Sequence, residues 1–117
     1  MPTLREYATE FRRLSDELDA SLAELAALSA EWAEKEVGHK KRWAVAYIKS
    51  TQPNQKGRES DATTATGDSL LGYLMAERMA RVAREAVESR RTQISALQSL
   101  LAAERNSNEA ELYGPES

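Results

Sequence analysis

Large apolar residues recur along the first third of the chain at alternating intervals of three and four residues. This alternation is the heptad pattern of a coiled-coil helix, and charged residues occupy most positions in between. Thr3 and Glu6 have the spacing of a capping box, which marks a helix start. The pattern therefore predicts a long helix from about residue 3. Its seam, which we also expect to join subunits of an oligomer, consists of Leu4, Tyr7, Phe11, Leu14, Leu18, Leu25, Leu28 and Trp32.

The heptad pattern shifts after Trp32. The next large apolar residue in the seam is Trp43, and a step of eleven residues corresponds to a four-residue stutter. Gly38 lies inside this step and costs about 1 kcal/mol relative to alanine in a helix interior, so the pattern fits both a continuous helix and a break. A continuous helix extends to about Lys49, because the residue before Pro53 avoids helical angles.

Residues 50–60 are polar and contain Pro53 and Gly57, which predicts a loop. A second helix is expected from about residue 61 to residue 105, although a delayed start at residues 68–69 fits the pattern equally well. Residues 106–117 are predicted to be a polar, flexible tail. The apolar residues that define the second helix are Leu71, Leu74, Met75, Met79, Val82, Ala86, Val87, Ile94, Leu97, Leu100 and Leu101.

Two long helices joined by one polar loop predict an all-α fold, in which residues 1–105 form one antiparallel helical hairpin. The chain has only five Gly, three Pro and 6% aromatic residues, too few for the turns of an all-β fold. Each helix of a hairpin buries one face, so we expect apolar residues to remain exposed in a monomer, namely Trp43, Tyr47, Tyr73 and Met75. Such exposed surface predicts a homo-oligomer.

The composition argues against several kinds of functional site. The chain has no cysteine, so it has no disulfide or cysteine metal site, and its only histidine, His39, cannot form a histidine cluster. Glycine-rich phosphate loops and paired carboxylates are also missing. We therefore expect no catalytic residues, no metal and no cofactor. The absence of a run of about 20 apolar residues predicts a cytoplasmic protein with no membrane partner.

The charge is distributed unevenly along the chain. The net charge of −3 combines −5 over residues 1–34, +6 over residues 35–58 and small negative values beyond. Basic groups mixed with aromatic rings are typical of single-stranded DNA binding, where cations contact phosphates and bases stack on the rings. The candidate nucleic-acid-binding residues are Lys40, Lys41, Arg42, Lys49, Lys56, Arg58 and Trp43, extended by Arg90 and Arg91 on the second helix.

Structural roles also explain the same residues. Trp43 and Tyr47 have the helical spacing of core residues, and His39 fits a helix surface better than a ligand set. The basic segment fits a solvated face or a contact with the acidic first helix of a neighbouring subunit. Both interpretations remain open at this point.

One arrangement of motifs resembles a known family. Lys40-Lys41-Arg42-Trp43 ends a long helix, Lys56-Gly57-Arg58 follows in a polar loop, and residues 86–101 close the second helix. Over roughly residues 30–105, this order resembles the small tailed-phage recombination mediators of the UvsY type. The resemblance implies a ring-like oligomer that binds single-stranded DNA and helps to load a RecA-type recombinase by displacing single-strand-binding protein. It implies DNA contacts at Lys40, Lys41, Arg42, Lys49, Lys56 and Arg58, followed by Arg90 and Arg91.

The sequence thus predicts a non-enzymatic, single-stranded DNA-binding accessory protein, of the phage recombination mediator class. Two alternatives remain. A coiled-coil structural or adaptor protein would use its heptads to bind a partner, and a small phage inhibitor would bind a host protein.

Overall fold

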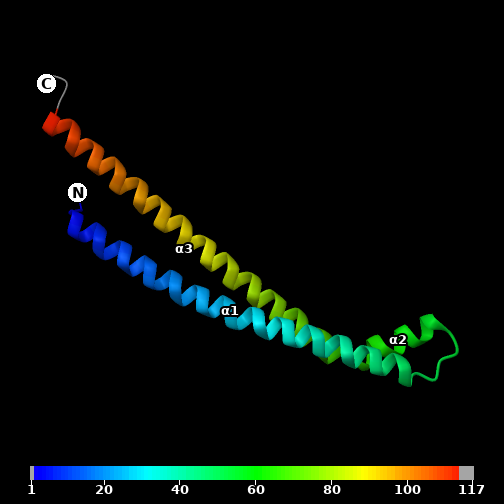
Figure 1. Ribbon diagram of the computed structural model, residues 1–117. Helices are drawn as coiled ribbons and strands as arrows, with labels where there is room; N and C mark the ends of the chain where they lie inside the picture. Colours follow the sequence, from blue (N-terminus) through cyan, green and yellow to red (C-terminus); the bar gives the residue numbers. More distant parts are fainter. Residues whose placement is uncertain (1, 114–117) are drawn as a thin grey trace. The chain divides into compact units, whose positions relative to one another are not determined.

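The computed structural model describes residues 2–113, with side chains placed up to residue 108. These residues form three α-helices and no strand, in the order α1 (Leu4–Lys49), α2 (Gln55–Ala65) and α3 (Gly67–Tyr113) (Figure 1). The predicted all-α class is therefore confirmed. The two long helices, α1 and α3, are the arms of the predicted hairpin, and α2 belongs to the connection between them.

The contacts group the chain into two compact units. The first unit combines the chain up to Ala23 with the chain from Glu85 onward, and the second unit spans Glu24–Arg84. In the first unit, Phe11 and Leu101 line one hollow. Glu17, which follows Phe11 in the sequence, pairs with Arg90, which precedes Leu101. In the second, Lys35 and Gly72 border one hollow, and Trp43 contacts the earlier Thr63. In both units, residues later in α1 therefore contact residues earlier in the returning part of the chain, as in antiparallel helices.

The start and the continuity of α1 follow the sequence pattern. Thr3 N–H donates to Glu6 Oε2 at 3.1 Å, and Glu6 N–H donates to Thr3 Oγ1 at 3.2 Å, which completes the predicted capping box. The helix passes through Gly38 without a break. Trp32, Glu36, His39 and Trp43 are all at least partly buried. Their steps of four, three and four residues follow a step of four from Leu28, which is the predicted stutter.

The predicted loop over residues 50–60 is too long. Helix α2 begins at Gln55 because Asn54 caps it: Asn54 Oδ1 accepts a 2.6 Å hydrogen bond from Gly57 N–H. The Asn54 carbonyl also accepts from Arg58 N–H at 3.1 Å. The loop is therefore limited to residues 50–54, and the predicted second helix starts too late and is not a single helix.

Thr66 separates α2 from α3. Its φ and ψ angles of −112° and 18° interrupt the helix, and both its N–H and its hydroxyl donate to the Ala62 carbonyl, at 3.1 and 2.7 Å. Its own carbonyl accepts from Leu70 N–H and Ser69 Oγ, both at 3.0 Å. These four bonds satisfy the backbone at the joint, and α3 begins close to the later of the two predicted starts.

The predicted tail over residues 106–117 also begins too early. The backbone of α3 is helical to Tyr113, and residues 114–117 lie outside the described residues. No Gly or Pro occurs between Arg105 and Tyr113, so nothing in this stretch forces the helix to stop.

The buried face of α3 consists mainly of small residues. Ala76, Ala80, Ala83 and Val87 are buried at steps of four, three and four, which is a heptad seam. Most of the large residues predicted to define this helix lie on other faces and are substantially exposed, namely Leu71, Leu74, Met75, Met79, Val82 and Leu100. Val87 and Leu97 are buried in agreement with the predicted pattern, and Met75 is exposed as expected. The prediction was wrong for Ala76, Ala80 and Ala83, which it did not include.

The predicted oligomer seam of α1 is largely covered within one chain. Leu14 is buried, Leu4 is 63% exposed, and the other six are half-buried, namely Tyr7, Phe11, Leu18, Leu25, Leu28 and Trp32. Half-burial also applies to Trp43, Tyr47 and Tyr73, which were expected to be exposed. Seven of the eight residues of the α1 seam are therefore at least partly covered within a single chain.

We predict opposite effects of alanine at two glycines. A Cβ at Gly38 would have no neighbour within 4 Å, so Gly38→Ala should raise the free energy of unfolding by about 1 kcal/mol through better helix propensity. A Cβ at Gly57 would lie 2.9 Å from Gln52 Cβ and 3.0 Å from Asn54 Oδ1, so Gly57→Ala should destabilise. Urea unfolding followed by circular dichroism measures both. A loss of stability in Gly38→Ala would contradict the continuous α1.

A second prediction concerns the close packing of the alanine seam. Ala80 is only 2% exposed, so Ala80→Leu must push α3 away from its neighbours and should cost about 1–3 kcal/mol. The neighbouring Met79 is 53% exposed, so Met79→Leu serves as the control and should change stability by less than about 0.5 kcal/mol. Equal effects of the two leucines in urea unfolding would show that the seam is not tightly packed.

Candidate nucleic-acid interface

The two units differ in charge. The second unit has ten Lys and Arg against eight Asp and Glu, a net charge of +2, whereas the first has six against eleven, a net charge of −5. The basic segment of residues 35–58 lies entirely in the second unit and runs from the last four turns of α1 into α2. A polyanion is therefore expected to approach the second unit.

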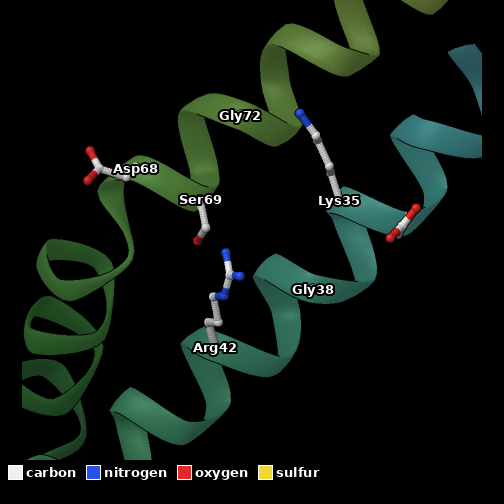
Figure 2. Close-up of a pocket in the computed structure, with 7 residues that line it drawn as sticks. Lys35, Gly38, Arg42, Asp68, Ser69 and Gly72 are labelled. Atoms are coloured by element: carbon white, nitrogen blue, oxygen red, sulfur yellow. The ribbon is translucent and has the colours of Figure 1, made fainter.

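A groove crosses one side of the second unit. Its first part, a hollow of about 430 Å³, includes Gly38 and Gly72 in its lining (Figure 2). Its second part, of about 490 Å³, includes Lys41, Val45 and Lys49 from α1 and Ala65 and Thr66 from the joint. The two parts share Arg42, Asp68 and Ser69 and so form one surface, which we call the Arg42 groove. Figure 2 shows Arg42 extending toward Ser69, while Asp68 points away from Arg42.

Helix geometry aligns three cations along this groove. Lys35, Arg42 and Lys49 are seven residues apart, which is close to two turns and about 10.5 Å of helix per step. All three line the groove, and Lys41 adds a fourth cation beside Arg42. The carboxylates of Glu34 and Asp68 also border the first part, so the excess of positive charge is confined to the second part.

The cations of the basic segment differ in their partners. Lys35 pairs with Glu31 at 3.2 Å and Lys40 pairs with Glu36 at 3.0 Å, one turn away on the same helix. The hydrogen bond to Glu36 raises the pKa of Lys40. Within the described residues, no carboxylate lies within 4.0 Å of the five other cations of this segment, namely Lys41, Arg42, Lys49, Lys56 and Arg58.

The predicted site residues in α2 divide between an exposed and a structural role. Lys56 is exposed. Arg58 is half-buried, its Nε donates to the Gln52 carbonyl at 3.0 Å, and its guanidinium carbon lies 6.0 Å from the centre of the Tyr47 ring. Arg58 therefore holds the loop and α2 against α1.

Trp43 does not line the groove, because it faces α2. Its Nε1–H donates to Thr63 Oγ1 at 3.4 Å, and its ring stacks on Tyr47 with centroids 5.5 Å apart and planes inclined by 23°. The structure thus favours the core interpretation of Trp43 over a base-stacking role.

His39 connects α1 to the α2–α3 joint. Its Nδ1 lies 2.8 Å from Ser69 Oγ, which in turn lies 3.0 Å from the Thr66 carbonyl, and its ring stacks on Tyr73 at 6.0 Å. When the Ser69 hydroxyl donates to the Thr66 carbonyl, His39 must donate through Nδ1–H. The half-buried His39 is thus a packing residue, and the Ser69 hydroxyl is already hydrogen-bonded to it.

The predicted extension at Arg90 and Arg91 belongs to the first unit, so the structure does not assign these residues to the groove. Arg90 pairs with Glu17 at 3.2 Å and donates to Gln93 at 3.2 Å. Arg91 is exposed. The ion pair with Glu17 indicates that Arg90 stabilises the packing of α3 against α1.

Sequence reasoning missed the residues that complete the groove from the far side, namely Thr66, Asp68, Ser69 and Gly72. The only sequence signal was that two glycines, Gly38 and Gly72, occur inside long helical patterns. A glycine at such a position often has a packing or functional role.

No family model, no curated protein and no solved structure matches this chain. Within the described residues, no group of three or more potential ligand side chains could hold a metal ion, and no described helix is long and apolar enough to cross a membrane. The groove and its cations are therefore the features from which a function must be argued.

Proposed function

We propose that this protein is a non-enzymatic accessory protein that binds single-stranded DNA in the Arg42 groove. One observation carries the proposal: Lys41, Arg42 and Lys49 line one hollow, and no described carboxylate lies within 4.0 Å of their charged groups. Unpaired cations along a groove supply the electrostatic attraction that governs binding to a nucleic-acid backbone. Binding releases counterions from the strand and requires no covalent step.

The process in which this binding would act is inferred from the resemblance to UvsY-type mediators. A protein of that class would hold single-stranded DNA, assist the displacement of single-strand-binding protein and help to load a RecA-type recombinase. The preference for a single strand over a duplex rests on the same resemblance. The cations of the Arg42 groove support the binding step, on which the later steps depend.

We predict a defined salt dependence for this binding. Three phosphate contacts per subunit should give a slope of about −2 in a plot of log affinity against log salt, since each contact to a single strand contributes about −0.7. Arg42→Ala should reduce the slope by about 0.7, and the triple change of Lys41, Arg42 and Lys49 to alanine should abolish it. Fluorescence anisotropy with a labelled single-stranded oligonucleotide at 50–300 mM salt measures these slopes.

The chain offers a matched control for this experiment. Lys40→Ala removes the same charge one position away from Lys41, but Lys40 is paired with Glu36 and does not line the groove. Its slope should equal that of the unmodified protein. Equal losses for Lys40→Ala and Lys41→Ala would contradict a defined groove, and undetectable binding at 50 mM salt would contradict the function.

A second candidate function, a coiled-coil adaptor, is favoured by one face of α3. Leu71, Met75, Met79 and Val82 follow at steps of four, four and three residues and are 53–59% exposed. Such a continuous apolar face is typical of a protein-binding helix. In the mediator, the same face would join copies of this chain, and in an adaptor it would hold a helix of another protein.

We predict that the exposed α3 face joins subunits. Met75→Glu combined with Met79→Glu should convert an oligomer into a monomer without loss of helix content, because both side chains are more than half exposed. Sedimentation at micromolar concentration and circular dichroism measure the two effects. Arg84→Glu changes the net charge by the same two units at an exposed position outside this face and should leave the mass unchanged. A monomeric unmodified protein would contradict self-association and favour the adaptor.

A further inference from the structure

The part of the strand that the groove recognises can be inferred from its lining. Resting on the proposed function, we infer that the Arg42 groove binds the phosphates of a single strand and that no base stacks on the protein. Binding is then insensitive to the presence of bases. This assignment differs from the usual single-strand site, in which aromatic side chains supply stacking platforms.

The Trp and Tyr rings of the second unit are engaged in internal packing. The unit contains Trp32, Trp43, Tyr47 and Tyr73, and all four are half-buried. Trp43 and Tyr47 stack on each other, and Tyr73 stacks on His39. The indole nitrogen of Trp32 is buried. Their burial and stacking reduce the ring surface that a base could contact.

The groove itself contains no aromatic side chain. Its second part is lined by the cations Lys41, Arg42 and Lys49, the aliphatic Val45 and three small residues, besides Asp68 and Ser69. The Ser69 hydroxyl already contacts His39 Nδ1 and the Thr66 carbonyl. The charged side chains of this lining are three cations and one carboxylate, and this excess of positive charge favours an anion over a neutral base.

The carboxylates determine where the phosphates lie. The first part of the groove is lined by two carboxylates, Glu34 and Asp68, and by two cations, Lys35 and Arg42. Among the described residues that line the second part, Asp68 is the one carboxylate beside three cations, and it points away from Arg42 (Figure 2). Phosphates should therefore contact Lys41, Arg42 and Lys49 and avoid the end of the groove near Glu34. Arg42 can hold one phosphate through two parallel hydrogen bonds, and the two lysines act as point charges.

The test compares two oligonucleotides with equal numbers of phosphates. One is a thymidine 20-mer, and the other is a 20-mer of abasic sites. Their dissociation constants for the full chain should agree within threefold at 50 mM salt. Arg42→Ala should weaken both by the same factor, which shows that both occupy the groove. Tryptophan emission of the protein should be unchanged when the thymidine 20-mer saturates it.

Other results of this experiment would overturn either the inference or the proposed function. Base stacking on an aromatic ring contributes about fivefold or more in affinity per base. Binding of the abasic strand more than threefold weaker than that of the thymidine strand, or quenching of tryptophan by the thymidine strand, would overturn the inference and leave the proposed function intact. Failure of both strands to bind would overturn the proposed function, and the inference with it.

Discussion

Two helices packed side by side can bury only one stripe of each helix, and this constraint explains most features of the second unit. The buried stripe of α3 contains Ala76, Ala80 and Ala83, and small residues at a helix contact allow the backbones to approach closely. Gly38 and Gly72 remove further side-chain volume beside this stripe, where the first part of the groove lies. The large residues of α3, including Met75 and Met79, are consequently displaced to a face that the chain leaves uncovered.

The same geometry separates residues that are adjacent in sequence. Arg42 and Trp43 are neighbours, but consecutive positions in an α-helix point about 100° apart. Trp43 is directed toward Thr63 of α2, whereas Arg42 lines the groove. A segment that is both basic and aromatic in sequence therefore becomes a packed aromatic face and a separate cationic face. The aromatic face attaches α2, and this attachment leaves the cations accessible on the other side.

The sequence was sufficient for the parts of the fold that depend on local pattern. The capping box of Thr3 and Glu6, the long first helix and the stutter after Trp32 all follow from residue spacing. The start of α2 depended on Asn54 and Gly57, inside a polar stretch whose composition is typical of a loop. Val87 and Leu97 of the α3 seam follow the expected pattern, but Ala76, Ala80 and Ala83 were missed, because large apolar residues were expected where the tight contact selects alanine. The basic segment of the sequence identified the cations of the groove. The opposite wall of the groove is formed by residues about 25 positions later, and only the three-dimensional structure shows that they lie there.

The charge distribution links the groove to the exposed face of α3. The first unit has a net charge of −5 and would repel a polyanion, so the proposed binding would be confined to the few cations of the second unit. About three phosphate contacts would produce weak binding at physiological salt, because each contact is opposed by counterions in solution. Copies of the chain joined through the apolar face of α3 would present several grooves to one strand, and linked sites raise the overall affinity without any new type of contact. On this argument a single groove is too weak to act alone, and the proposed DNA-binding function requires the self-association that the uncovered α3 face favours.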